Sequence, residues 1–346
     1  MKDNEPTLRE QVKKHATEIP KKKRKYEGNT SEVVSTGSTL LDLAISGGRI
    51  KGGGIPGGIL VEIFGPSGSG KTVLLSEIAG SIQRKGGEIM FHDPEARLNK
   101  QFAQLFDLNT DEINYTVPNT IPEVFGSIRS WQPKGGINGI MTDSLAALST
   151  DMEMDNKEGD KMGMRRAKEF SEELRRTCRI LTQNNLLLVC SNQVRVNMDA
   201  GIYGQKYTTP GGEAVGFYSS LRLRFMKPEK IKAKERIVGK EVTRIIGVRT
   251  EIEVFKSSVW KPYRTAPVTI LFDYGIDDIR ENLQFIKDFT KNTVYCIGDE
   301  KLSNSMEEAI KIIESSNSEE RLKKQVIELW EEIESKFDIE RKPKKR

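Results

Sequence analysis

The sequence is short of cysteine and of long apolar runs, and each shortage excludes a class of protein. Its three cysteines (Cys178, Cys190 and Cys296) are odd in number and lack the spacing of metal ligands. This excludes a disulfide framework or a zinc module and favours a reducing compartment. No run approaches the roughly 18 consecutive apolar residues of a membrane span, and the polar N-terminus is unlike a signal peptide. We therefore expect a cytoplasmic protein without a membrane partner.

The net charge of +5 over 346 residues is unevenly distributed along the chain. Residues 1–36 carry a net +3, residues 37–150 carry −2, residues 151–275 carry +7 and residues 276–346 carry −3. A positive excess confined to one middle segment favours a polyanionic partner. A solvated charged face explains the same numbers, so the motifs within that segment have to decide between the two.

The middle of the chain has the pattern of an α/β fold. From residue 59 to residue 275, short apolar runs alternate with helical stretches, as in a mostly parallel sheet flanked by helices. The first four predicted strands are separated by helix-length segments, and the last three form a more antiparallel group. In chain order the predicted strands are 59–64, 88–92, 137–142, 186–191, 219–225, 244–253 and 266–272.

The two ends of the chain differ from this middle. Residues 1–34 predict a short helix near 7–17 followed by a basic linker, with a role in oligomerisation. The composition changes after Gly275, and residues 276–338 predict a small α-rich (α+β) C-terminal domain with helices at 306–314 and 318–337. Within the second helix, one apolar face recurs at helical spacing and comprises Leu322, Val326, Leu329, Ile333 and Phe337. Residues 339–346 form a basic tail.

One motif predicts a phosphate-binding loop. It matches G-x-x-x-x-G-K-[ST] between a predicted strand and a predicted helix, which is the context that this motif requires, and it reads Gly65-Pro66-Ser67-Gly68-Ser69-Gly70-Lys71-Thr72. Its glycines let backbone N–H groups turn toward phosphates at a helix N-terminus. Lys71 is expected to reach the β- and γ-phosphates of ATP, and the Thr72 hydroxyl to coordinate Mg²⁺.

Three polar groups at predicted strand ends complete a nucleotide hydrolase. Asp143 follows an apolar strand and can hold the Mg²⁺ water shell, whereas Glu95 can orient or deprotonate the attacking water. Gln193 follows the fourth strand and can hydrogen-bond the γ-phosphate. Ligands of open α/β sheets bind at the carboxyl ends of the strands, so we expect these side chains to share one site.

Taken together, these segments resemble the RecA family of strand-exchange recombinases, of the bacterial type or its phage relatives. The resemblance covers about residues 35–275 well and the C-terminal domain more loosely. The segments occur in the family's order and are 35–38 with Leu41-Asp42, 65–72, 93–95, 143–148, 192–195 and 211–218. The resemblance implies a RecA-like P-loop NTPase core with ATP on residues 65–72, Glu95 as the catalytic acid and Asp143 as the Mg²⁺ ligand.

The same resemblance assigns further site residues. Gln193 is similar to the γ-phosphate sensor, and Asn99 and Phe102 stand where the family contacts adenine. Segments near 151–164 and 194–211 resemble the two DNA-binding loops. Both lie in the +7 segment, together with the DNA-contacting positions Lys168, Arg175, Arg195, Gly211 and Gly212. Lys256 matches the first of two lysines that reach a neighbouring protomer's γ-phosphate, and Ser258 stands at the second.

The leading hypothesis is a DNA-dependent ATPase that forms helical filaments on single-stranded DNA. It would catalyse homologous pairing and strand exchange with double-stranded DNA in recombination and repair. One alternative is a hexameric helicase of the same core fold. Such a helicase would normally carry a separate N-terminal domain and a linker helix, and the roughly 36 residues that precede the core here count against it. A second alternative is a recombination mediator that binds ATP and DNA with little turnover. Ser258 favours the mediator, whereas Lys71, Glu95 and Asp143 count against it.

Overall fold

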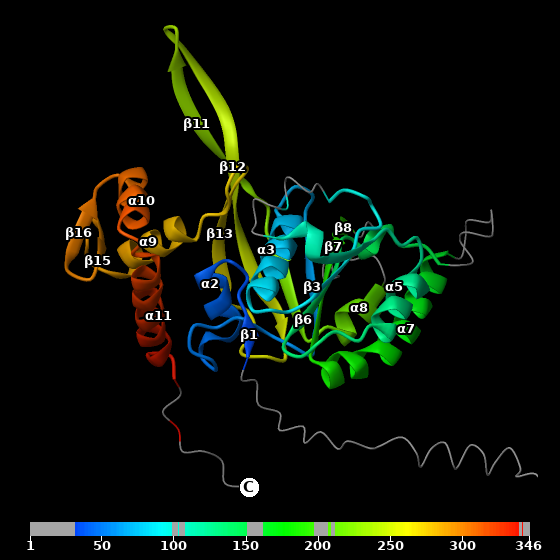
Figure 1. The fold of residues 1–346 in the computed structure, drawn as a ribbon. Coiled ribbons are helices and arrows are strands. Elements are labelled where there is room, and N and C mark those ends of the chain that lie inside the picture. The colour runs from blue at the N-terminus through cyan, green and yellow to red at the C-terminus, as the bar shows by residue number, and fades with distance from the viewer. Residues whose placement is uncertain are drawn as a thin grey trace, which may run out of the picture. The chain divides into compact units, whose positions relative to one another are not determined.

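The computed structural model describes residues 32–98, 103, 108–150, 162–196, 207–208, 212–338 and 341. These residues form a ten-stranded, mostly parallel sheet with helices on both faces (Figure 1), which confirms the predicted α/β class. The predicted helix near 7–17 and the basic tail, apart from Arg341, lie outside the described residues. None of the described helices is both long and apolar enough to cross a bilayer.

Six strands make the parallel part of the sheet, and their order is β10-β3-β7-β6-β4-β5. They are β3 (Leu60–Gly65), β4 (Ile89–His92), β5 (Ile113–Thr116), β6 (Asn138–Thr142), β7 (Leu186–Gln193) and β10 (Leu221–Phe225). The inner strands are almost continuously apolar because helices cover both of their faces. Five of them were predicted from the sequence; β5 was missed because its residues are mostly polar and exposed.

The remaining strands of the sheet are antiparallel. They are β11 (Glu229–Ile237), β12 (Lys240–Ser257), β13 (Thr265–Leu271) and β14 (Gly275–Ile276). The expectation that strand 219–225 belongs to this group is wrong in part, because β10 pairs parallel with β3 and antiparallel with β12. β11 and the first part of β12 form a long hairpin that projects from the sheet (Figure 1), and β11 was not predicted.

The period-two alternation of the strands divides the core between the two faces. On β7, Leu187 and Val189 pack on the face of α3 (Lys71–Arg84), whereas Leu186, Leu188 and Cys190 pack on the opposite face. That opposite face is covered by α5 (Ile121–Ser130), α7 (Met162–Asn184) and α8 (Gly212–Tyr218).

The C-terminal part contains three helices and a short hairpin. These are α9 (Asp278–Phe289), β15 (Tyr295–Ile297), β16 (Glu300–Ser303), α10 (Met306–Ser315) and α11 (Glu319–Ser335). In α11 the buried stripe is Leu322, Val326 and Trp330. Phe337, which the sequence assigned to this apolar face, lies beyond the helix and is exposed. The domain boundary after Gly275 stays a prediction.

Short elements complete the described chain. They are β1 (Val33–Val34), α2 (Thr39–Asp42), η1 (Leu43–Gly47), β2 (Ile55–Pro56), η2 (Thr110–Glu112), η3 (Leu145–Ala147), β8 (Arg195–Val196) and β9 (Tyr207–Thr208). β8 and β9 pair antiparallel inside the segment 194–211.

Two buried carboxylates hold α2 in place. Asp42 accepts hydrogen bonds from Ser35 Oγ at 2.5 Å and from the N–H and hydroxyl of Thr36 at 2.8 and 2.7 Å. Asp278, at the start of α9, accepts from the N–H and hydroxyl of Thr39, both at 2.7 Å. Burial raises the pKa of Asp42 to about 7, although the hydrogen bonds from Ser35 and Thr36 oppose this shift.

The raised pKa of Asp42 predicts a pH-dependent stability. The folded state binds this proton more tightly than the unfolded state, whose pKa is near 3.8. Protonation of Asp42 therefore stabilises the folded state fully below pH 3.8, and this stabilisation is lost as the pH rises through about 7. Between pH 4.5 and 7.5, the free energy of unfolding should fall by about 3 kcal/mol more in the wild type than in Asp42→Asn. Urea unfolding at the two pH values measures this; parallel profiles would contradict it.

Candidate nucleotide-binding site

The phosphate loop connects the end of β3 to the start of α3, as its motif predicts. Gly68 and Gly70 adopt φ values of +70° and +98°, a left-handed conformation that favours glycine. At Gly65, an added Cβ would lie 2.6 Å from Phe225 Cβ and 2.8 Å from Phe225 O, so only glycine lets the loop pass β10. The loop therefore leaves its backbone bare in front of the N-terminus of α3, where anions bind.

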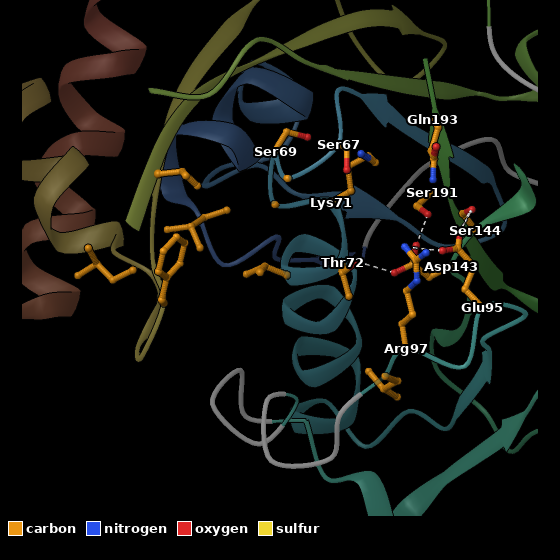
Figure 2. Close-up of a pocket in the computed structure, with 18 residues that line it drawn as sticks. Ser67, Ser69, Lys71, Thr72, Glu95, Arg97, Asp143, Ser144, Ser191 and Gln193 are labelled. Atoms are coloured by element: carbon orange, nitrogen blue, oxygen red, sulfur yellow. Dashed lines mark hydrogen bonds and ion pairs between the residues drawn. The ribbon is translucent and has the colours of Figure 1, made fainter. Parts of the chain in front are cut away.

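A cavity of about 390 Å³ lies at this loop, and Figure 2 shows its lining. Lys71, Thr72, Glu95, Asp143 and Gln193, all selected from the sequence, line it together. Loop residues Ser67, Gly68, Ser69 and Gly70 also line it. Parallel strands whose ends meet at one edge bring these residues into a single site, as expected.

Lys71 is held by the loop that precedes it. Its Nζ donates hydrogen bonds to Pro66 O at 2.7 Å and to Gly65 O at 3.2 Å. Burial lowers the pKa of Lys71, and the nearby carboxylates of Asp143 and Glu95 act in the opposite direction. The ammonium group of Lys71 is therefore held by two backbone carbonyls at the edge of the cavity.

Asp143 forms the centre of an oxygen-rich group. Thr72 Oγ1 donates to Asp143 Oδ2 at 2.6 Å, and Ser191 Oγ donates to Asp143 Oδ1 (Figure 2). These contacts join the first turn of α3 to the ends of β6 and β7. A hydroxyl and a carboxylate side by side are the hard oxygen ligands that Mg²⁺ prefers.

Both oxygens of Glu95 also have partners. Ser144 Oγ donates to Oε1 at 2.7 Å, and Arg97 Nη1 lies 2.6 Å from Oε2. Ser144 follows Asp143 directly, so the residue that holds Glu95 is adjacent in the chain to the second acid of the site. Sequence reasoning missed Ser144, Ser191 and Arg97; the hydroxyls next to Asp143 and Gln193 were the available signal.

Gln193 is the last residue of β7 and lies beside the first residue of the phosphate loop. In the β3–β7 register, Gln193 is paired with Gly65. Its backbone N–H donates to Asn192 Oδ1 at 3.1 Å, while its exposed side chain lines the cavity.

An apolar wall faces these polar groups, and sequence reasoning missed it. Val248, Ile270, Leu271 and Phe272 come from β12, β13 and the residue that follows β13. Phe272 directly follows the end of β13 and is 46% exposed. The cavity thus combines a polar end with a flat apolar side.

The other predicted residues do not all join this cavity. Lys256 lies on β12 and donates to Gly216 O at 2.8 Å and Phe217 O at 2.9 Å, at the C-terminal end of α8. Gly212 begins α8. Asn99, Phe102 and Gly211 lie outside the described residues, and for Arg195 only the backbone, in β8, is described.

The cations of α7 divide into two groups. Arg166 Nη2 donates to Leu145 O and Ala146 O at 3.2 and 2.6 Å and so ties α7 to the segment after β6, whereas Arg176 pairs with Glu173 within α7 itself. Lys168 and Arg175 are exposed, and the nearest acid to Lys168 is Glu172 at 4.0 Å. Exposed cations of this kind can contact a nucleic acid backbone.

The residues of the cavity fit a magnesium nucleotide. The glycine backbone at the helix N-terminus suits phosphates, and the Thr72–Asp143 pair suits the metal. The apolar side around Phe272 suits a planar base.

Replacing Asp143 should specifically weaken the metal-dependent part of nucleotide binding. Asp143→Asn keeps the shape and the contact with Thr72 but removes the charge. We expect Mg²⁺ to raise the affinity of the wild type for a fluorescent ATP analogue by some factor. In Asp143→Asn we expect this factor to be smaller by about tenfold or more. Titrations with and without Mg²⁺ measure this, with Thr72→Ser, which retains the hydroxyl, as the control. Unchanged enhancement in Asp143→Asn would exclude Asp143 as a metal ligand.

Known proteins that are similar to this chain identify its family. The model of the RecA N-terminal domain matches residues 10–277. A protein RecA of Borrelia hermsii is 33% identical over 289 residues, which cover 82% of this chain and 77% of that protein. A protein RecA of Rickettsia massiliae is 34% identical over 245 residues, which cover 71% and 67%, respectively. The chain therefore belongs to the RecA family of recombinases, which act in DNA recombination and repair.

Proposed function

We propose that this protein is a DNA-dependent ATPase that assembles as a helical filament on single-stranded DNA and exchanges strands with homologous double-stranded DNA. The observation that carries the proposal is the convergence of Lys71, Thr72, Glu95, Asp143 and Gln193 on one cavity beside the phosphate loop. A module that only binds nucleotide has no need of a carboxylate such as Glu95 at this position.

The roles in hydrolysis follow from the chemistry of each group. Residues 65–72 hold the phosphates of ATP, and Thr72 and Asp143 hold Mg²⁺, which neutralises charge on the phosphates. Glu95 orients and deprotonates the attacking water, because its carboxylate is fixed by Ser144 at the polar end of the cavity. Asn99, Phe102 and Phe272 are proposed to contact the adenine.

Binding of DNA is proposed for the two segments near 151–164 and 194–211. Lys168, Arg175 and Arg195, with Gly211 and Gly212 at the end of the second segment, are the proposed contact positions. Contacts from lysine and arginine to phosphates give affinity without sequence preference. A protein that pairs any homologous sequence needs this kind of affinity.

The filament itself is proposed to complete the catalytic site. Lys256 does not line the cavity of its own chain and is exposed along part of its side chain. We assign it to the γ-phosphate bound by the neighbouring protomer. Ser258 stands at the second of the two interface positions, so of these two positions only Lys256 supplies a cation.

Substitution of Lys71 tests the coupling of ATP to DNA. Lys71→Ala should lower the ATPase rate at least about 100-fold because a cation at the phosphates is lost. It should also abolish the increase in single-stranded DNA affinity that ATP produces. Lys134→Ala, which removes an exposed lysine, is the matched control. Unchanged ATP-dependent DNA binding in Lys71→Ala would exclude the proposed coupling.

Electron microscopy of the full chain with an ATP analogue and single-stranded DNA tests the assembly. We expect helical filaments, together with an ATPase rate that single-stranded DNA stimulates. Closed rings with duplex unwinding would instead identify a helicase. Monomers that bind DNA without a stimulated ATPase rate would identify a mediator.

The salt dependence of binding tests the DNA-contacting role of α7. Each lost phosphate contact to single-stranded DNA should reduce the slope of log affinity against log salt by about 0.7. The double variant Lys168→Gln/Arg175→Gln should therefore lower the slope by about 1.4. The double variant Lys324→Gln/Lys336→Gln removes the same charge from α11 and from the residue that caps its C-terminus, and it should leave the slope unchanged. Equal slopes in the two double variants would remove Lys168 and Arg175 from the interface.

A further inference from the structure

A carboxylate is buried in the strand that leads into the phosphate loop. Glu62, in the middle of β3, is fully buried. Arg222 Nε donates to its Oε2 at 2.6 Å, and Asn192 Nδ2 donates to its Oε1 at 3.0 Å. A charge removed from water is strongly unfavourable unless such partners compensate it. None of these three residues lines the nucleotide cavity.

On one side, this buried group is connected to Gln193. The side chain of Asn192 donates to Glu62 and accepts a hydrogen bond from the backbone N–H of Gln193 at 3.1 Å. The amide orientation of Asn192 is therefore fixed by two bonds. A displacement of the β7 end, where Gln193 meets the cavity, changes the bond between Asn192 and Glu62.

On the other side, the group is connected to α8. The guanidinium of Arg222 lies 4.6 Å from the ring centroid of Phe64 and 5.3 Å from that of Phe255. It also lies against α8, since a Cβ added to Gly216 would be 3.0 Å from Arg222 Nη1.

Lys256 strengthens this second connection. It is paired with Arg222 in the β10–β12 register and donates to Gly216 O and Phe217 O, at the C-terminal end of α8. Burial lowers the pKa of Lys256, and the positive charge of Arg222 adds to this effect. Arg222 and Lys256 together therefore hold α8 against the sheet.

We propose that Glu62 and Arg222 are positioning residues that transmit the state of the nucleotide site from Gln193 to α8. The inference rests on the proposed function, because α8 begins directly after the segment 194–211 assigned to DNA. The path is continuous, running from Gln193 through Asn192 and Glu62 to Arg222 and α8. Because neither buried charge can be left unpaired, a movement at one end of the path shifts the favoured position of the other end.

Hydrogen exchange of α8 tests the connection without DNA. In the full-length wild type, ATPγS with Mg²⁺ should slow exchange of the α8 amides about tenfold or more. Glu62→Gln keeps the side-chain shape but removes the charge. It should bind ATPγS within about threefold of the wild type and lose most of the slowing in α8. Should Glu62→Gln fail to fold, Arg222→Lys serves instead, because it keeps the charge but loses the planar group between the two rings.

A second buried carboxylate with an arginine partner provides the matched control. Glu281 is 3% exposed, accepts hydrogen bonds from Arg249 at 2.9 and 3.1 Å and from Thr269 at 2.6 Å, and lies outside this path. Glu281→Gln should lower stability comparably but keep the response of α8. The proposal is overturned if α8 does not respond in the wild type, if Glu62→Gln keeps the full response, or if Glu281→Gln loses it equally.

Parallel titrations with single-stranded DNA separate this inference from the proposed function. If α8 responds to ATPγS in the wild type but DNA affinity does not, the proposed function fails and the connection stands. If ATPγS raises DNA affinity in the wild type but Glu62→Gln keeps the full response of α8, the function stands and the connection is wrong.

Discussion

The alignment of four parallel strands is the constraint on which the nucleotide cavity depends. Register pairs Gly65 of β3 with Gln193 of β7, and Thr142 of β6 with both Cys190 of β7 and His92 of β4. Glu95, Asp143 and Gln193 sit at these strand ends or within three residues beyond them, and Lys71 and Thr72 follow β3 at the start of α3. Because side chains alternate between faces, a one-residue shift in register would turn them away from one another. The side chains of these strands pack against α3 on one face and against α5, α7 and α8 on the other, and this packing fixes the register on which the site depends.

Hydroxyl groups convert this alignment into a defined geometry. Ser191 and Thr72 orient Asp143, and Ser144 orients Glu95, so each acid is held by a short side chain from a neighbouring element. Short side chains lose little conformational freedom on folding, which makes them efficient supports for a site. Asp143 and Ser144 are joined by a cis peptide bond.

Much of the fold and of the polar half of the site was predictable from the sequence, because apolar periodicity and the loop motif are local signals. Apolar runs revealed β3, β4, β6 and β7, and polar residues at their ends marked Glu95, Asp143 and Gln193. Contacts that form only in the tertiary structure have no local sequence signal. The contacts of Arg97 and Ser144 with Glu95 depend on loop geometry, and the position of Phe272 at the cavity depends on the antiparallel strands packing near α3. β11 was missed because its alternating lysines resemble a solvated segment until the register with β12 is known.

The projecting hairpin has a consequence for solubility. Among the described residues, β11 pairs only with β12, so the backbone of its other edge is unpaired by any strand. Such an edge can recruit a second copy of the same strand and start aggregation. Lys230, Lys232, Lys234 and Arg236 recur at every second position of β11. Two such strands brought edge to edge would place rows of like charges beside each other, and the repulsion between these rows opposes pairing between the sheets of two copies.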